Sequence, residues 1–470
     1  MTRSVSHMGI HLAWRRPMRI ARALGWLALG GLAWGCDSAA TSADSFDATA
    51  KKRAKWVQHE IEERNAWLDD DVRAEKYGEM AASPLSFFRG TSHLYYADLA
   101  DEDRLDDYGT EETRTFLQGD LHVGNFGSFH DDEGRVVYDV NDYDEAFVGD
   151  YQLDLWRGAV SIALVGDELD LDADDQQSAV EAFAQAYVQA CEDFADGDAE
   201  DDFAVTADSA EGQLAEFLAE VESKNTRAKM LGKWTSVVDG ERLLNPDNDD
   251  LAPIDDGLRE ALVDSLPSYG DTLSGGLSFD EGYFAVKDVA LRLHAGVASL
   301  GVPRYYVLIE GPTTSLADDV LLDIKYASTA TALDYLDEDH GFSSEAERIV
   351  AGQKALLTNT DDHLGWFELD GDGYVVRERS PSKDDLDPTE LEGADALEQL
   401  AAQWGTILAA DHARGDRDFD DALVPSSLEK GVLDAVEGRR TKFYAHVWKV
   451  SSSYATQVRA DRKAFLSMIE

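Results

Sequence analysis

The stretch Gly119–Phe126, which reads GDLHVGNF, holds Asp, His and Asn at fixed offsets between small residues. Asp120 and Asn125 lie five positions apart, and a further acid, Asp142, follows an apolar run. Transfer of a phosphoryl group needs a residue that positions or deprotonates the acceptor hydroxyl, and oxygen ligands for Mg²⁺. Because Mg²⁺ prefers carboxylate and amide oxygens, the spacing predicts Asp120 as the base and Asn125 and Asp142 as metal ligands.

The residues around this stretch predict how it is positioned. Arg114–Asp120 (RTFLQGD) predicts a short strand that runs into the loop, and Gly134–Phe147 predicts another strand followed by an acidic turn. Apolar residues at i, i+3 and i+4 predict helices over Tyr151–Val165 and Ser178–Ala195. Within the loop, His122 is expected to pack and orient the chain, and a role as proton carrier is the alternative.

Several further motifs, taken with the loop, resemble known proteins. GDLHVGN is similar to the Gly-Asp-x-His-x-x-Asn catalytic loop of the aminoglycoside-phosphotransferase branch of the protein-kinase-like superfamily, and Asp142 falls where that branch has its metal-binding aspartate. With FFRG, VNDYDEA and DLWRGAVS, Ala81 to Asp416 resembles the bacterial family called domain of unknown function 2252, excluding the acidic insert. The resemblance implies a two-lobed, kinase-like α+β fold, with ATP and Mg²⁺ as cofactors. It also implies transfer of phosphate to a hydroxyl of an unknown acceptor.

A kinase-like fold needs a nucleotide lobe, and the residues before the loop offer no strand that carries a lysine. After the loop, Val286–Gly311 predicts two strands, Asp318–Ala327 a third that carries Lys325, and His363–Arg379 a hairpin. The later helix in ALEQLAAQWGTILAADHARG resembles the helix that ordinarily leads into the catalytic loop. This order of elements predicts a circularly permuted kinase, in which the β-rich nucleotide lobe follows the catalytic loop.

The same comparison predicts which residues hold the nucleotide. Gly296 and Gly301 lie between the first two strands and are expected to let backbone N–H groups approach the phosphates. Lys325 is expected to neutralise phosphate charge and to be held by an acid on the helix over Ser343–Asn359. Glu347 is the first choice for that acid, and its neighbour Glu345 is a close rival.

These assignments divide the chain into five parts. They are a signal peptide over 1–35, a tether over 36–50, a helical lobe with the catalytic loop and an acidic insert over 51–285, a β-rich nucleotide lobe over 286–380, and helices that complete the helical lobe over 381–470.

The N-terminus predicts export. A basic segment over residues 15–22, with four arginines, precedes a short apolar run that ends at Cys36, as in a bacterial lipoprotein signal. Cys36 is therefore expected to be lipidated, which would place the protein outside the cytoplasm, attached to a membrane only through its lipid. Ordinary secretion and a retained anchor are the alternatives, and mass spectrometry of the mature N-terminus distinguishes the three. Cys191 then has no disulfide partner, and its apolar helical surroundings predict a buried residue.

The charge of −52, from 94 acidic and 42 basic residues, disfavours nucleic acid as a partner because phosphates would be repelled. Besides the phosphotransferase, two other functions are open. One is an inactive kinase-like protein that binds nucleotide or serves as a surface interaction lipoprotein, since little ATP is present outside the cytoplasm. The other is a calcium-binding lipoprotein. Asp170–Glu181 has acids at the positions of a calcium loop, although Asp175 stands where a glycine is required.

Overall fold

The structure is a computed structural model that describes residues 42–470, apart from 101, 274, 295–299, 337 and 339–340. The chain separates into two units, Met1–Ala50 and Lys51–Glu470. The predicted signal peptide and Cys36 lie outside the described residues. The helix α1 (Ser42–Arg64) begins within the predicted tether, so residues 42–50 of that stretch are helical. Among the described residues, no helix has both the length and the apolar character needed to cross a membrane.

The larger unit has a mixed α/β fold in which most helices pack around one hydrophobic core. The two predicted helices that precede the acidic insert (residues 200–285) are confirmed as α5 (Gln152–Glu168) and α6 (Ala173–Phe194). The helices α11 (Ala394–Arg414) and α14 (Arg440–Ile469) pack with them. Cys191 of α6 is fully buried, as predicted. The other α-helices described are α2 (Asp70–Ala82), α3 (Pro84–Arg89), α4 (Ser92–Leu99), α7 (Gly212–Lys224), α8 (Arg227–Trp234), α9 (Asp256–Gly270), α10 (Glu345–Leu356), α12 (Arg417–Asp420) and α13 (Leu428–Val436).

The stretch that resembles a calcium loop forms the start of α6. The Asp172 side chain accepts hydrogen bonds from the backbone N–H groups of Asp174 and Asp175, both at 3.0 Å. Acids at this end of a helix satisfy free N–H groups and interact favourably with the helix dipole. Capping therefore accounts for this acidic sequence.

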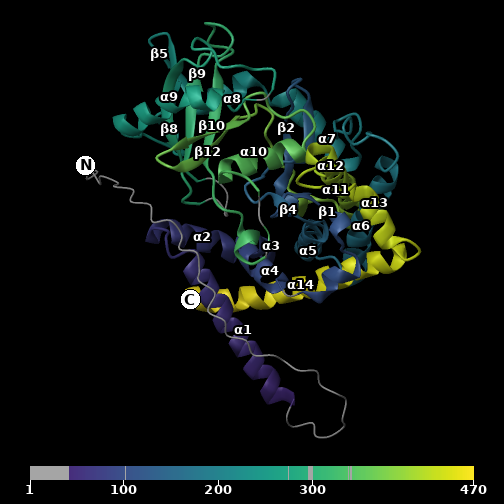
Figure 1. The fold of residues 1–470 in the computed structure, drawn as a ribbon. Helices are drawn as coiled ribbons and strands as arrows, with labels where there is room; N and C mark the ends of the chain where they lie inside the picture. Colours follow the sequence, from purple (N-terminus) through teal and green to yellow (C-terminus); the bar gives the residue numbers. More distant parts are fainter. Residues whose placement is uncertain (1–41, 101, 274, 295–299, 337, 339–340) are drawn as a thin grey trace. The chain divides into compact units, whose positions relative to one another are not determined.

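A six-stranded antiparallel sheet forms the β-rich part, in the order β11-β12-β10-β9-β8-β7. Figure 1 labels four of these strands, β8, β9, β10 and β12. Its strands are β7 (Leu251–Ala252), β8 (Val286–Arg292), β9 (Arg304–Ile309), β10 (Val320–Tyr326), β11 (Gly365–Leu369) and β12 (Asp372–Glu378). The three strands and the hairpin predicted for this region are confirmed. The helix α10 follows β10 in the chain and packs against β12 (Figure 1).

Much of the predicted acidic insert packs on this sheet and not on the helical core. On one face Trp234 of α8 contacts Tyr306, and on the other Tyr269 of α9 lies in a cluster with Val307. Successive side chains of a strand point to opposite faces, so the insert covers both faces of β9. The boundary predicted at residue 285 is therefore corrected: α8, β7 and α9 belong with the sheet.

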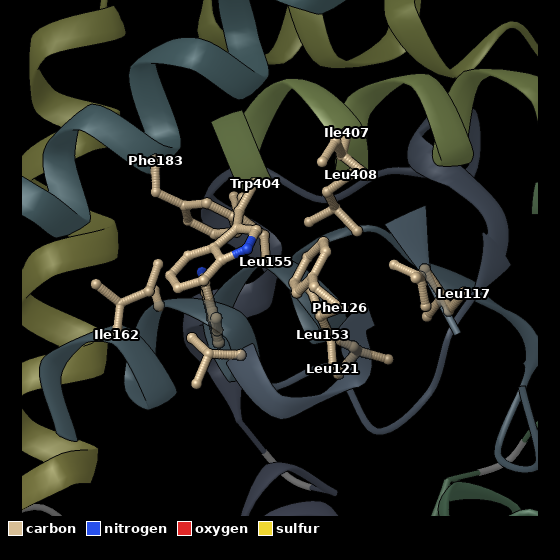
Figure 2. Close-up of a cluster of buried hydrophobic side chains, with 14 of the residues drawn as sticks. Leu117, Leu121, Phe126, Leu153, Leu155, Ile162, Phe183, Trp404, Ile407 and Leu408 are labelled. Carbon is tan, nitrogen blue, oxygen red and sulfur yellow. The ribbon is translucent and has the colours of Figure 1, made fainter. Parts of the chain in front are cut away.

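Short strand pairs carry the GDLHVGN loop. β1 (Arg114–Leu117) pairs with β4 (Phe147–Asp150), and β2 (Phe126–His130) pairs with β3 (Val136–Val140). A separate hairpin elsewhere in the chain joins β5 (Thr235–Val238) to β6 (Glu241–Leu244). Figure 2 shows the apolar side chains beneath the loop, where Leu121 and Phe126 lie among residues of α5, α6 and α11. Phe126 stacks on Trp404 of α11, with ring centroids 5.6 Å apart. The polar loop is therefore held in place by apolar side chains that pack into the helical core.

Candidate functional site

The β2–β3 hairpin brings the two predicted metal ligands together. β2 starts directly after Asn125, and β3 ends directly before Asn141 and Asp142. Phe126 pairs with Val140, and the backbone N–H of Asn141 donates to the carbonyl of Asn125 at 2.8 Å. The register of the hairpin therefore places Asp142 one residue from the position opposite Asn125.

The start of the loop is fixed by backbone contacts that require particular residues. Gly119 has φ +88°, and the backbone N–H groups of Gln118 and Gly119 donate to the buried Asp154 carboxylate at 2.6 and 3.0 Å. The Gln118 side chain donates to the carbonyl of Asp142 at 2.6 Å. A Cβ on Gly119 would lie 1.9 Å from the Glu145 carbonyl oxygen. The loop and the turn around Asp142 are therefore packed directly together.

Gly119→Ala should lower the free energy of unfolding by about 2–4 kcal/mol. A side chain in the left-handed region costs about 1 kcal/mol, and overpacking adds about 1–3 kcal/mol. Gly134→Ala is the matched control, because Gly134 also has a positive φ (+77°) but nothing lies within 4 Å of its added Cβ. Denaturant titration of both variants measures the difference. Equal losses would contradict the close approach to Glu145.

Asp120 is held by Arg157 of α5. The guanidinium Nε donates to Asp120 Oδ1 at 2.6 Å, and Nη2 forms an ion pair with the same oxygen. Arg157 is fully buried, and its guanidinium carbon lies 4.2 Å from the centre of the Phe88 ring. Burial raises the pKa of Asp120 to about 7, although the positive charge of Arg157 acts in the opposite direction.

Three oxygen atoms of the predicted site have no bonded partner within the described residues. Arg157 uses only Oδ1 of Asp120, which leaves Oδ2 without a hydrogen bond. The Asn125 amide donates from Nδ2 to the Asp120 carbonyl at 3.1 Å, which leaves Asn125 Oδ1 without a hydrogen bond in the described chain. Asp142 accepts one long hydrogen bond through Oδ1, from the Asp144 N–H at 3.4 Å, and its Oδ2 has no hydrogen bond to the residues that the structure describes. Two carboxylate oxygens and an amide oxygen fit the ligand preference of Mg²⁺.

Lys325 of β10 lies at the turn that contains Asp142. Its ammonium forms an ion pair with Asp144, more than 180 residues earlier in the chain. Burial would raise the pKa of Asp142, but the positive charges of Lys325, Arg377 and Lys383 outweigh it, so that this pKa is lowered. The sheet thus places a lysine at this turn, and Asp142 is favoured in its charged form.

The acids predicted to hold Lys325 are otherwise engaged. Glu347 accepts hydrogen bonds from the backbone and side chain of Ser343 in the cap of α10, so among the described residues it does not pair with Lys325. Glu345 forms an ion pair with Arg348 at 2.7 Å. The prediction for Glu347 is therefore wrong. Ser344 caps the helix, and Ser343 before it engages the carboxylate of Glu347, whose position in the first turn suits capping.

Arg348 is the residue of α10 that reaches the turn. It is fully buried, and its guanidinium donates to the backbone carbonyls of Asp144 (2.8 Å), Ser328 (2.8 Å) and Ala146. It thereby fixes the turn after Asp142 to the segment that follows β10. This role of Arg348 was not predicted, because a buried arginine in an amphipathic helix gives no signal of its own in the sequence.

The surroundings of His122 and Gly301 show how each compares with its expected role. His122 is buried, with no hydrogen bond to Nδ1 within the described chain, and its pKa is lowered by burial and by Arg89 and Arg157. A neutral, packed His122 agrees with the orienting role and gives no proton route. Gly301 (φ +84°) packs so closely against Leu68 that an added Cβ would lie 2.5 Å from the Leu68 side chain. Gly301 itself is therefore covered by the segment between α1 and α2. Gly296 lies outside the described residues.

The chain belongs to a bacterial family. The family model described as "Uncharacterized protein conserved in bacteria (DUF2252)" matches residues 69–468. No curated protein and no solved structure matches the chain. The membership predicted from the motifs is confirmed, and the match extends beyond Asp416 to include the C-terminal helix α14.

Proposed function

We propose that this protein is an ATP-dependent phosphotransferase that uses Mg²⁺ and transfers phosphate to a hydroxyl of an acceptor. The observation that carries the proposal is the set of unbonded oxygens on Asp120, Asn125 and Asp142, next to the ion pair of Lys325 and Asp144. Phosphoryl transfer depends mainly on positioning and on neutralising charge. This set supplies an acceptor for a proton, hard metal ligands and a cation.

Each residue has a distinct part in the proposal. Asn125 Oδ1 and Asp142 Oδ2 would hold Mg²⁺, which neutralises charge on the phosphates when bound. Asp120 Oδ2 accepts the proton of the acceptor hydroxyl, while Arg157 keeps the carboxylate oriented through Oδ1. Lys325 approaches the phosphates from the sheet and remains beside Asp144.

The placement of α11 supports the permuted arrangement. The backbone N–H of Phe116, in β1, donates to the carbonyl of Gly415 at 3.0 Å, and Thr115 Oγ1 donates to the carbonyl of His412 at 2.6 Å. The end of α11 therefore lies beside the strand that leads into the loop. This is the adjacency expected if α11 replaces the helix that precedes the catalytic loop in an unpermuted kinase.

A second candidate is a protein that binds nucleotide without transferring phosphate. The observation that favours it is the buried ion pair between Asp120 and Arg157, which offsets the charge of the proposed base. Both candidates predict metal-dependent nucleotide binding, and only the first predicts release or transfer of the γ-phosphate.

Thermal unfolding with ATP, GTP and ADP, each with Mg²⁺, Mn²⁺ or EDTA, tests the proposal. A nucleotide at 100 times its dissociation constant should stabilise the protein by about 2.7 kcal/mol, and EDTA should remove most of that gain. The calcium-binding alternative predicts stabilisation by Ca²⁺ with no response to nucleotide. Absence of any nucleotide effect would contradict both kinase-like candidates.

A further inference from the structure

A partly open pocket lies between the β2–β3 hairpin, the end of β12 and the segment after β12. Its empty volume, including space that is open to solvent, is about 650 Å³. Asn141 and Tyr143, which flank Asp142 in the chain, line this pocket, whereas Asp142 and Lys325 lie outside its lining. The pocket therefore adjoins the candidate metal site but does not contain its ligands.

Three cations line the pocket: Arg377, Arg379 and Lys383. The two guanidiniums each donate to a backbone carbonyl at 3.2 Å, Arg377 to Asn141 and Arg379 to Ser380. Over the residues that the structure describes, none of the three cations forms an ion pair with a carboxylate. In a chain with 94 acidic and 42 basic residues, carboxylate partners are abundant, so three neighbouring cations without one are unexpected.

Each acid that lines the pocket forms its ion pair with a residue other than these three cations. The pairs are Asp131 with Arg135 (2.7 Å), Asp323 with Arg304 (2.6 Å), Asp361 with His363 (3.0 Å) and Glu378 with Arg227 (2.5 Å). Among the described residues, Arg377, Arg379 and Lys383 are therefore left without a bonded carboxylate, although four acids line the same pocket.

Lys383 shows the effect of the neighbouring cations most clearly. Burial and the positive charges of Arg377, Arg379 and Arg304 lower its pKa to about 7, despite the negative charge of Asp385. Its ammonium makes no side-chain hydrogen bond within the described chain. A bound anion would offset the repulsion among these cations and supply the missing hydrogen-bond acceptor.

The wall that presents Lys383 is fixed to the β2 strand. The backbone N–H of His130 donates to Ser380 Oγ at 2.9 Å, and the Ser128 hydroxyl donates to the carbonyl of Ser382 at 2.7 Å. The backbone N–H of Ser128 donates to the carbonyl of Asp384 at 2.9 Å. The cations therefore stand at defined positions, as a binding site requires.

We propose that Arg377, Arg379 and Lys383 form a binding site for a phosphate group, separate from the metal site. Guanidinium groups match the tetrahedral oxyanion through pairs of N–H donors, and the ammonium adds a point charge. The pocket is partly open, so the phosphate group can belong to a free ion or to a small phosphorylated molecule. The site requires neither ATP nor a divalent cation.

Calorimetric titration of the whole protein, in low-salt buffer with EDTA, tests this site. The probes are sulfate, inorganic phosphate and ribose 5-phosphate. We expect all three to bind without metal, and Lys383→Met to weaken sulfate binding at least tenfold. Lys354→Met is the matched control and should bind sulfate as the parent does, because Lys354 is a half-buried lysine of α10 outside the pocket lining.

This titration tests the anion site independently of the phosphotransferase, because EDTA removes the Mg²⁺ that the phosphotransferase would need. Tighter binding of ribose 5-phosphate than of phosphate supports a phosphorylated small molecule, and equal affinities support free phosphate as the ligand of the same site. Lys383→Met should not lower the unfolding temperature without anion, since it replaces an unpaired, desolvated charge. Arg379→Met provides the test if that variant does not fold. No binding of any probe, or sulfate binding by Lys383→Met equal to that of the parent, would overturn the proposal.

Discussion

Asp120→Asn is expected to slow release of the γ-phosphate of ATP by about 10²–10⁴-fold, the usual contribution of a general base. Asn has nearly the same shape and can still accept the hydrogen bond from Arg157, but its amide cannot take the proton of an acceptor hydroxyl. Binding of Mg-ATP should change little, because the unbonded oxygens of Asn125 and Asp142 remain. The rate can be measured as transfer of labelled phosphate to water or to the protein itself.

The matched control for this variant is Asp174→Asn, which neutralises an exposed acid in the first turn of α6. It should have the parent rate. A rate for Asp120→Asn within a few-fold of the parent would contradict its role as base. A parent protein that binds Mg-ATP but releases no phosphate would instead support the second candidate, in which Arg157 offsets the charge of Asp120.

Asp142→Ala is expected to weaken metal-dependent nucleotide binding by roughly 100-fold or more. Loss of groups that merely orient a metal ligand typically costs 10–100-fold, and Asp142 is proposed to contact the metal directly. The fold should survive, since the Asp142 side chain accepts only one long hydrogen bond. Calorimetric titration with ATP in the presence of Mg²⁺ gives the affinity.

Asp144→Ala separates the metal role of Asp142 from a general loss of charge at the turn. Asp144 pairs with Lys325 and has no proposed contact with the metal, so its loss should affect metal affinity much less. If the two variants lose the same affinity, Asp142 has no special role as a ligand.

The sequence was sufficient to predict the elements that carry the loop and the strand that carries Lys325. Strand and helix periodicity are local properties, and the register of one short hairpin brings Asn125 near Asp142. Arg157 could have been found as well. It stands three positions after Asp154 in α5, so both side chains project from the same face of the helix toward the loop.

The contacts between distant segments could not be predicted in the same way. Glu347 lies at a suitable position in the sequence for a partner of Lys325, but its carboxylate bonds to Ser343 beside the helix cap. Lys325 instead forms an ion pair with Asp144, which is distant in the sequence. The unpaired charge of Lys383 is likewise a property of the folded protein. It depends on which acids already form ion pairs with other residues. A composition with more acidic than basic residues would instead predict a carboxylate partner for Lys383.

Electron paramagnetic resonance of Mn²⁺ most directly tests the central claim, that Asn125 and Asp142 form a metal site for a nucleotide. Mn²⁺ is titrated into the parent protein and into Asp142→Ala, each with and without a non-hydrolysable ATP analogue. We expect one tightly bound Mn²⁺ per parent chain that depends on the analogue, and loss of that ion in Asp142→Ala. Equal Mn²⁺ binding by the two proteins, or no binding by the parent with the analogue present, would contradict the claim.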